Sequence, residues 1–372
     1  MKLASLSLTN FRNYRRLEMD VGPGVNVLFG RNAAGKTNVL EAVFFLSTSK
    51  SHRAHQDQEL VLRGEEALAV QAVVDSGYGQ IQAEIRYLRD HRKQVRLGGS
   101  AVRVVDLLGR IPVVLFAPDD LQMLKGSPAL RRRYLDLFLS QTHPAYFSAL
   151  QSYLRVVTQR NGLLRSLREG GGDLGTLDVW DEQLLDYGTA VVAHRLEALG
   201  PIQERARAAQ AQLSQEREAL TISYVLSAGG KPEGKQQIRE ALAVALRDRR
   251  REELARAQTT VGPHRDDLAV LINGADARSF GSQGQQRSAV LALKLAELAY
   301  LRDHLGTAPI LLLDDVTSEL DGGRRGVLLD AVGREAQTFI TCTTLEDLDP
   351  RWLEASRLYQ VEAGQVRPHS IA

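Results

Sequence analysis

Residues 25–40 read VNVLFGRNAAGKTNVL and predict a strand, a phosphate-binding loop and the start of a helix. The apolar run stops at Gly30, and Gly35, Lys36 and Thr37 complete the pattern G-x-x-x-x-G-K-[ST]. Glycine is needed at both positions because the backbone must turn tightly and bring its N–H groups close to phosphate oxygens. The pattern therefore predicts a site for the phosphates of a nucleotide.

The residue types in this loop suit particular parts of a bound ATP with its Mg²⁺ ion. Lys36 is expected to meet the β and γ phosphates, and Thr37 is expected to hold the metal through its hydroxyl. The N-terminus of the following helix adds its partial positive charge. The nucleotide-binding residues expected here are Gly30, Arg31, Asn32, Ala33, Ala34, Gly35, Lys36, Thr37 and Asn38.

Length and composition limit the kinds of protein this chain can be. Its 372 residues suit two or three domains, and 47 Lys and Arg against 45 Asp and Glu leave any nucleic-acid surface to local clustering. Cys342 is the sole cysteine, which excludes an internal disulfide and a cysteine-based zinc site. There is no run of about 18 apolar residues of the kind a membrane span needs. We expect a cytoplasmic protein.

The hydrophobic period divides the chain into three segments. Residues 1–118 and 257–372 alternate predicted strands and helices and so have α/β character. Between them, in residues 119–256, the period changes from 2 to 3.6 and Leu and Ala replace Val and Ile. The predicted fold class is therefore α/β, with mixed sheets and helices and an inserted, mainly helical arm.

The expected elements follow from the same patterns. The first segment predicts strands at 2–8 and 17–21 around a polar turn at 10–16, an antiparallel sheet across 68–106, and a buried strand at 112–116. The insertion predicts helices at 128–140, 144–168 and 176–218, the last interrupted at Gly200 and Pro201, then a strand at 220–225 and a helix at 236–257. The last segment predicts strands at 268–272, 309–313 and 338–342, helices at 285–305 and 323–332, and a hairpin at 357–366.

A second motif supplies the carboxylates that a phosphate loop requires. Residues 310–315, ILLLDD, place two acids at the end of an apolar strand, at the edge where open α/β sheets bind ligands. Asp314 is expected to hold Mg²⁺, and Asp315 to orient or deprotonate the attacking water. With Lys36 these are the predicted catalytic residues. The segment SELD (318–321) follows. Its carboxylates either belong to the nucleotide site or cap the N-terminus of the next helix.

A third motif opens the helix expected at 285–305. Residues 282–286 read SQGQQ, and Ser282, Gly284 and Gln285 at a helix start would form an anion site by the same physics as the phosphate loop. Alone, a plain capped helix is the simpler interpretation. The three motifs together, in this order, favour a second nucleotide-binding segment.

The motifs resemble the ABC-type ATPase superfamily and, within it, most closely the RecF family of bacterial recombination and gap-repair ATPases. The segments that carry the resemblance are FGRNAAGKTNVLEA (29–42), KSHR (50–53), VLFAPDDLQMLKGSPALRRRYLD (114–136), VGPHRDDL (261–268), GSQGQQR (281–287) and LLLDDVTSELD (311–321). The resemblance implies an ABC-type head formed by 1–118 and 257–372, with 119–256 as the arm.

The resemblance also implies how the protein works. ATP would clamp two heads into a homodimer, each nucleotide lying between the phosphate loop of one chain and residues 282–286 of the other. Association would create a groove for duplex DNA near single-strand/double-strand junctions, with RecR and RecO as partners. Asp315 stands where most ABC ATPases have Glu, which predicts slow hydrolysis. The segment FITCTTLED (339–347) has no His, which leaves Thr341 or Thr343 as γ-phosphate sensors.

Clusters of basic residues are the candidates for DNA phosphate contacts, with a solvated surface charge as the alternative for each. Only Phe11 and Tyr14 lie among them as aromatics, so backbone contact with a duplex is favoured over base stacking. The preferred candidates are Arg12, Arg15, Lys50, Arg53, Arg92 and Lys93. The alternatives for the whole protein are a nucleotide-binding subunit of an ABC transporter and a chromosome-organising ATPase, for which the arm is too short.

Overall fold

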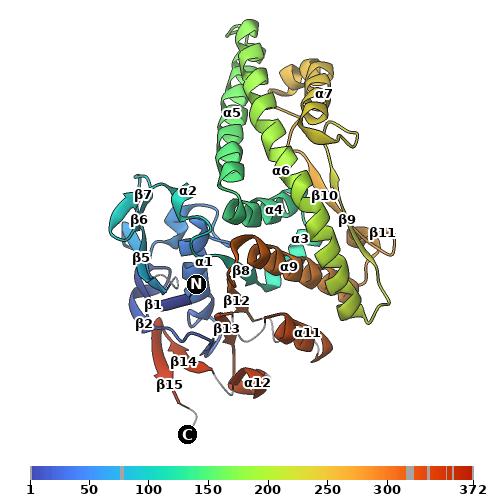
Figure 1. Ribbon diagram of the computed structural model, residues 1–372. Coiled ribbons are helices and arrows are strands. Elements are labelled where there is room, and N and C mark those ends of the chain that lie inside the picture. Colours follow the sequence, from blue (N-terminus) through green and yellow to red (C-terminus); the bar gives the residue numbers. More distant parts are fainter. Residues whose placement is uncertain are drawn as a thin grey trace. The chain divides into compact units, whose positions relative to one another are not determined.

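The computed structural model describes residues 2–75, 79–315, 322–332, 336–348, 350–353 and 356–370 (Figure 1). The chain forms two compact units, one made of Met1–Asp120 with Lys294–Ala372 and the other of Leu121–Leu293. In the described part of the chain no helix has the length and apolar character that crossing a bilayer requires.

The first unit contains a largely parallel sheet that carries the phosphate loop. Its strand order is β15-β14-β3-β13-β12-β8, and all neighbours are parallel except β14 and β15. The central strands β12 and β13 are buried at every residue, as their apolar runs predict. The strands are β3 (Val25–Phe29), β8 (Val113–Phe116), β12 (Ile310–Asp314), β13 (Thr338–Cys342), β14 (Arg357–Glu362) and β15 (Gln365–His369).

A second, antiparallel sheet completes this unit, in the order β2-β1-β4-β5-β6-β7. The prediction of a polar turn over 10–16 is wrong. Phe11 and Tyr14 pair across a hairpin, and its turn holds only two residues. Arg12 takes a left-handed φ of 53° in that turn. The strands are β1 (Lys2–Phe11), β2 (Tyr14–Asp20), β4 (Ala67–Asp75), β5 (Gln80–Leu88), β6 (Gln94–Leu97) and β7 (Ser100–Val102).

Helix α1 (Lys36–Thr48) lies between the two sheets. It contacts β8, β12 and β13 of one sheet and β1, β4 and β5 of the other. Every residue from Val39 to Thr48 is buried, as expected for a helix that is apolar on all sides. The shorter elements of this unit are α2 (Val104–Leu107), α11 (Gly322–Val332), α12 (Pro350–Leu353) and the 3₁₀ turns Asp57–Leu60 and Leu345–Asp347.

The second unit is mainly helical. Helices α5, α6 and α7 pack against one another beside a three-stranded antiparallel sheet of order β11-β10-β9. Its elements are α3 (Gln122–Lys125), α4 (Pro128–Thr142), α5 (Pro144–Arg168), α6 (Leu174–Ser214), β9 (Leu220–Val225), α7 (Gly234–Arg256), β10 (Asp267–Ile272), β11 (Ala275–Asp276) and α8 (Ala277–Phe280). Helix α9 (Gln283–Leu305) begins in this unit and ends in the first.

The prediction that the helix is interrupted at Gly200 and Pro201 is wrong, because α6 continues through both residues. A proline inside a helix costs roughly 3 kcal/mol through the lost hydrogen bond and the ring clash. Ala198, Ile202 and Ala206 are buried on either side of it, and their packing holds the helix together at this point.

One unit boundary differs from the expectation. Residues 257–293 were expected with the α/β segment, whereas they cluster with the helical unit. The reason is strand pairing, because β10 forms an antiparallel ladder with β9, with Asp267 opposite Val225. The other boundary falls after Asp120, two residues from the expected position.

Candidate nucleotide site

The phosphate loop connects β3 to α1 and requires glycine for steric reasons. Gly30 has a φ of 150° and Gly35 a φ of 120°, which L side chains rarely adopt. A Cβ on Gly30 would lie 2.3 Å from the carbonyl oxygen of Val361, and a Cβ on Gly35 would lie 2.6 Å from Nδ2 of Asn13. The two glycines therefore let neighbouring strands approach the loop, in addition to shaping its turn.

The tip of the β1–β2 hairpin holds this loop in place. The Tyr14 hydroxyl donates to the carbonyl of Gly35 at 3.0 Å, and Asn13 Nδ2 donates to the carbonyl of Ala34 at 3.1 Å. Asn38, in the first turn of α1, donates to Asn13 Oδ1 at 2.8 Å. Sequence reasoning did not identify Asn13 as part of the site, since nothing in the pattern indicates which loop a turn residue contacts.

Lys36 lies over the loop with its ammonium group directed at main-chain oxygens. Its Nζ donates to the carbonyls of Gly30 at 2.6 Å and Arg31 at 3.0 Å. Burial lowers the pKa of Lys36, and the nearby carboxylates of Asp315 and Asp314 act in the opposite direction. The structure thus brings all three predicted catalytic residues into one electrostatic neighbourhood.

Thr37 and Asp314 meet although they are 277 positions apart in the chain. The Thr37 hydroxyl donates to Asp314 Oδ1 at 2.8 Å. Thr341, on the neighbouring strand β13, donates to the same oxygen at 2.8 Å and accepts from the backbone N–H of Asp315 at 2.9 Å. The oxygen ligands of Thr37 and Asp314 are of the type Mg²⁺ prefers, so the pair fits the expected ion.

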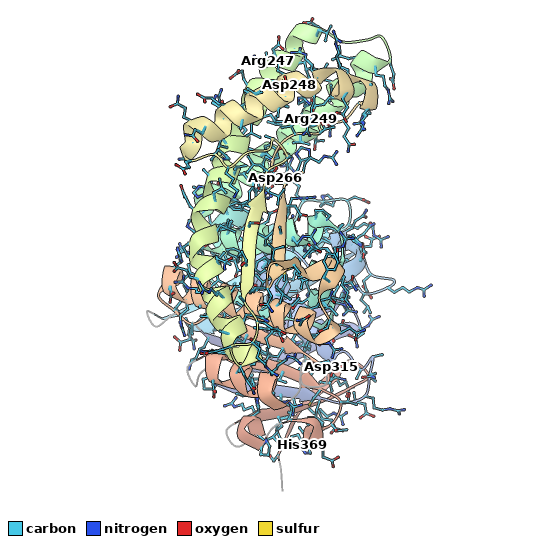
Figure 2. The ribbon with its side chains drawn as sticks, turned by 90° about the vertical axis from the view of Figure 1, so that its right-hand side faces the viewer. Arg247, Asp248, Arg249, Asp266, Asp315 and His369 are labelled. Carbon is cyan, nitrogen blue, oxygen red and sulfur yellow. The ribbon has the colours of Figure 1, made fainter. Side chains whose placement is uncertain are left out.

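Asp315 ends β12 in a conformation that is unusual for a residue other than glycine. Its φ is 51°, in the left-handed region, and its side chain is exposed (Figure 2). A carboxylate beyond the buried strand end is suited to meet water or a phosphate. The role of Thr341 as a sensor stays a prediction, as does that of Thr343.

Arg53 lies closer to the nucleotide site than the sequence suggested. Its Nη1 donates to Asn38 Oδ1 at 3.3 Å. Burial raises the pKa of Asp314, and the charge of Arg53 is one of the contributions that oppose this rise. The sequence grouped Arg53 with the candidates for DNA contact. Its position beside α1 also suits a phosphate of the nucleotide.

Two other basic candidates have partners inside the fold. Arg12 forms a two-pronged ion pair with the fully buried Glu41, at 2.7 and 2.8 Å. Lys93 pairs with Asp57 at 2.8 Å and lies 4.8 Å from the ring centroid of Phe45. Both side chains stabilise the fold, and their contact with DNA stays a prediction.

The remaining candidates are placed as follows. Arg15, Lys50 and Arg92 are exposed, which suits a contact with a polyanion. Ser282 and Gln285 lie in the second unit at the start of α9 and cap it reciprocally, because the N–H of each backbone donates to the side chain of the other. The segment 318–321 lies outside the described residues.

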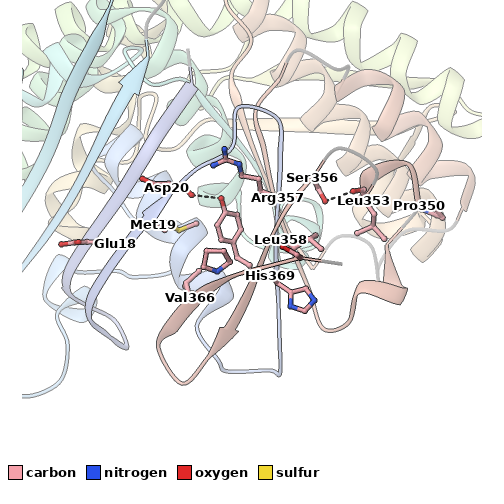
Figure 3. A pocket seen from close by; sticks show the side chains of 13 residues that line it. Glu18, Met19, Asp20, Pro350, Leu353, Ser356, Arg357, Leu358, Val366 and His369 are labelled. Atoms are coloured by element: carbon pink, nitrogen blue, oxygen red, sulfur yellow. Dashed lines mark hydrogen bonds between the residues drawn. The ribbon is translucent and has the colours of Figure 1, made fainter. Parts of the chain in front are cut away.

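A cavity of about 950 Å³ in the first unit lies elsewhere (Figure 3). Its lining includes Glu18, Met19, Arg357, Tyr359 and His369, and the Tyr359 hydroxyl donates to the carbonyl of Asp20 at 2.7 Å. No residue of the phosphate loop and neither carboxylate of the β12 end lines it. We therefore assign the nucleotide chemistry to the edge formed by β3, β13 and β12.

A phosphate loop after β3 and an aspartate at the end of β12, in one largely parallel sheet, define a nucleotide-binding protein of the P-loop class. The family model described as the RecF/RecN/SMC N terminal domain matches residues 2–366. The chain belongs to this family, and its relatives identify the RecF branch of it.

Relatives and solved structures agree with this assignment. The chain is 47% identical over 371 residues to "DNA replication and repair protein RecF" of Symbiobacterium thermophilum, covering 98% of each chain. It is 43% identical over 368 residues to the protein of the same name from Heliobacterium modesticaldum, covering 98% of this chain and 99% of that one. A structure of the recombination mediator protein RecF with ATP in the RecFOR pathway matches with a TM-score of 0.92 at 34% identity, covering 99% and 98%.

A more distant match shows the fold alone. An Smc head bound to the C-terminal winged-helix domain of ScpA matches with a TM-score of 0.57 at 15% identity, covering 100% of this chain and 98% of that one. The mixed α/β class expected from the sequence is confirmed, and so is the resemblance to the RecF family.

Replacing Asp314 with Asn should raise the melting temperature by a few degrees at pH 7 and abolish ATP hydrolysis. Burial raises the pKa of Asp314 above its usual value of 3.8, so its charged form is less favourable in the folded protein than in the unfolded chain. The free energy of unfolding therefore decreases as pH rises through this titration, and the neutral amide avoids that loss. The amide oxygen can still accept from Thr37 and Thr341.

Thermal melts at pH 4 and pH 7 without nucleotide, with an ATPase assay alongside, would measure this effect. The difference in melting temperature between variant and parent should be larger at pH 7. A variant that melts below the parent at pH 7 would contradict the account.

Proposed function

We propose that this protein is an ATP-dependent DNA-binding protein of recombinational DNA repair and replication-gap repair. The observation that carries the proposal is the hydrogen bond between Thr37 and Asp314, which joins the two halves of a nucleotide site from opposite ends of the chain. Family membership supports it, since the relatives are named as DNA replication and repair proteins. The same membership argues against a transporter subunit.

ATP binding joins two copies of the chain into a homodimer. Lys36 and the loop N–H groups of one copy hold the phosphates, and Ser282, Gly284 and Gln285 of the other copy close over them. The exposure of Ser282 at the start of a helix of 23 residues supports this role, because the helix N-terminus can then face an anion. Residues 119–256 act as the arm of each copy.

Hydrolysis is slow and releases the DNA. Thr37 and Asp314 would hold Mg²⁺, which neutralises charge on the β and γ phosphates. Asp315 orients the attacking water, and its carboxylate is one methylene shorter than the glutamate at this place in most ABC ATPases. Lys36 stabilises the developing charge on the transferred phosphoryl group.

The dimer binds duplex or gapped DNA through backbone phosphates. Arg15, Lys50 and Arg92 are exposed and suit this contact. RecR, together with RecO, is the proposed protein partner, in line with the RecFOR pathway named for the solved relative. The protein acts in the cytoplasm.

Gel filtration with and without ATP, followed by duplex-DNA binding in both states, tests the proposal. The protein should elute as a monomer without ATP and as a dimer with it, and only the dimer should bind DNA tightly. The proposal fails if ATP changes neither the mass nor the affinity for DNA.

A further inference from the structure

Two sets of arginines in the second unit differ in what they bind. Arg131, Arg160, Arg195, Arg239 and Arg250 are among those that form ion pairs with carboxylates. Around the loop 259–266, Arg132, Arg249 and Arg265 donate to main-chain carbonyls instead, and no ion pair within 4.0 Å is found for these three among the described residues. We call these three the carbonyl-anchored arginines.

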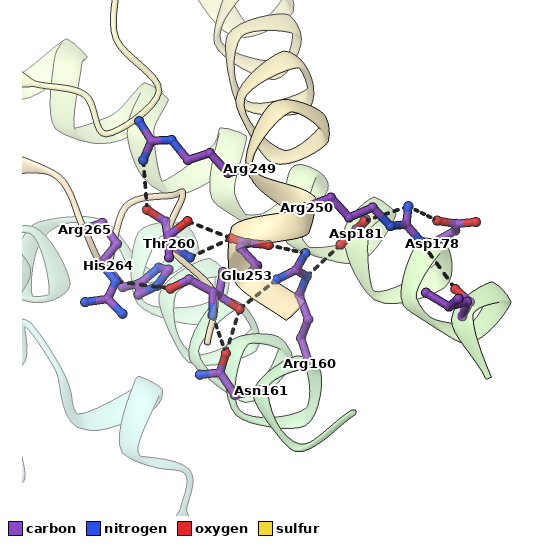
Figure 4. Close-up of polar contacts among 12 residues, drawn as sticks. Arg160, Asn161, Asp178, Asp181, Arg249, Arg250, Glu253, Thr260, His264 and Arg265 are labelled. Carbon is purple, nitrogen blue, oxygen red and sulfur yellow. Dashed lines mark hydrogen bonds and ion pairs between the residues drawn. The ribbon is translucent and has the colours of Figure 1, made fainter. Parts of the chain in front are cut away.

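All three converge on one loop, residues 259–266, between α7 and β10. Arg265 donates to the carbonyl of Thr259 at 3.2 Å, and Arg132 donates to that of Asp266 at 2.7 Å. Arg249 donates to the carbonyls of Thr260 at 3.4 Å and Ser227 at 3.0 Å. Figure 4 shows Arg249 and Arg265 beside Thr260 and His264, and Figure 2 labels Arg249 and Asp266.

Buried contacts hold this loop in one conformation. Gly262 has a φ of 120°, and a Cβ there would lie 2.2 Å from the Tyr153 hydroxyl, so only glycine fits. The Tyr153 hydroxyl in turn meets His264 Nδ1 at 2.5 Å. Glu253 accepts from the N–H of Thr260 at 2.6 Å. A loop fixed in this way presents its arginines with little further loss of conformational entropy on binding.

The carboxylates near the loop are already engaged. Asp266 is fully buried and accepts from the Tyr224 hydroxyl and from the N–H of Ser227, both at 2.7 Å. Asp267 is paired with Arg131 at 2.7 Å. A hydrogen bond to a neutral partner orients a charged group without neutralising it, and this holds for the three guanidinium groups and for Asp266 alike. Three positive charges then stand against the one negative charge of Asp266, which leaves a local surplus of positive charge.

The titration of His264 agrees with this surplus. The pKa of His264 is lowered to about 4, mainly by burial; its bond to Thr259 acts in the opposite direction, and the charges of Arg265, Arg132 and Arg160 contribute to the lowering. The histidine is therefore neutral at physiological pH and adds no charge of its own.

We propose that the carbonyl-anchored arginines bind phosphates of the backbone of duplex DNA. The inference rests on the proposed DNA-binding function and adds a contact surface in the second unit to it. A guanidinium presents a planar set of donors that matches phosphate oxygens. Base stacking is disfavoured because the nearby ring of Tyr153 is fully buried and the Tyr224 hydroxyl is bonded to Asp266.

The test measures how duplex affinity changes with salt in the full-length protein with ATP. Arg265→Gln and Arg249→Gln should each reduce the slope of log K against log [salt] by about 1 per chain, and each should weaken binding by roughly tenfold at moderate salt. Arg265→Lys should retain most of the slope because it keeps the charge. Fluorescence anisotropy with a labelled duplex gives both quantities.

Arg239→Gln is the matched control. Arg239 lies in the same unit, and its guanidinium is paired with Glu182 and Asp186, so its loss should leave the salt slope unchanged. An arginine that merely caps carbonyls would alter the melting temperature without altering the slope. Unchanged slopes for Arg265→Gln and Arg249→Gln, in protein that still dimerises and binds DNA with ATP, would overturn the inference. Failure of the unmodified protein to bind DNA would overturn the proposed function together with it.

Discussion

An equimolar mixture of Lys36→Met and Ser282→Arg chains should hydrolyse ATP at about one quarter of the unmodified rate per chain, although each variant alone is inactive. Half of the dimers in the mixture contain one chain of each kind. In such a dimer one site combines an intact Lys36 with an intact Ser282, whereas the other site has lost both. The expected recovery follows only if each nucleotide lies between two copies.

An ATPase assay across mixing ratios would measure this recovery, with a maximum expected at equal amounts. Lys36→Met mixed with Asp314→Asn is the matched control, because both substitutions lie in the same half of the site and no pairing restores it. A mixture of Lys36→Met and Ser282→Arg as inactive as either parent would count against the shared site. Equal recovery in the control mixture would count against it as well.

Replacing Arg195 with Leu should destabilise the second unit by roughly 3–5 kcal/mol. The buried guanidinium donates to Asp136 at 2.7 Å, to the hydroxyls of Tyr146 at 3.0 Å and Tyr224 at 2.8 Å, and to the carbonyl of Pro263 at 2.8 Å. These partners belong to α4, α5, β9 and the loop before β10. An aliphatic side chain leaves their polar atoms without this donor inside the unit.

Urea unfolding followed by circular dichroism would measure the loss. Arg239→Leu is the control, since Arg239 is 39% exposed and its ion pairs are worth less than about 1 kcal/mol. Similar losses for the two variants would mean that the buried network contributes no more than a surface pair.

The sequence predicted most elements of the fold because their patterns are local. The strand at 220–225 and the helix at 144–168 coincide with β9 and α5, and the strand at 338–342 coincides with β13. Two of the errors arose where distant contacts override a local signal. Phe11 and Tyr14 are core residues that extend the first hairpin, and buried neighbours carry α6 past Pro201.

The sequence predicts the motifs of the nucleotide site, but not the residues that hold these motifs in place. A glycine-rich loop and an aspartate after an apolar run are visible without a structure, and Thr37 meets Asp314 as the two motifs require. The ion-pair partners of basic residues cannot be read from the sequence. Arg12 and Glu41, for example, are 29 positions apart, and no spacing rule connects them. For the same reason the sequence could not separate Arg265 from any other exposed arginine.

The nucleotide site also determines when the molecule can become active during synthesis. Thr37 leaves the ribosome long before Asp314, 277 positions later, which corresponds to roughly 15–55 s at the usual speed of translation. Val25 pairs with Thr338, so β3 cannot pair with β13 until residue 338 has been synthesised. The second unit consists of one continuous segment, 121–293, and can fold while the strands of the first unit are still being made. A chain that stops short of β12 therefore carries the sequence of the phosphate loop but lacks Asp314, and its nucleotide site is incomplete.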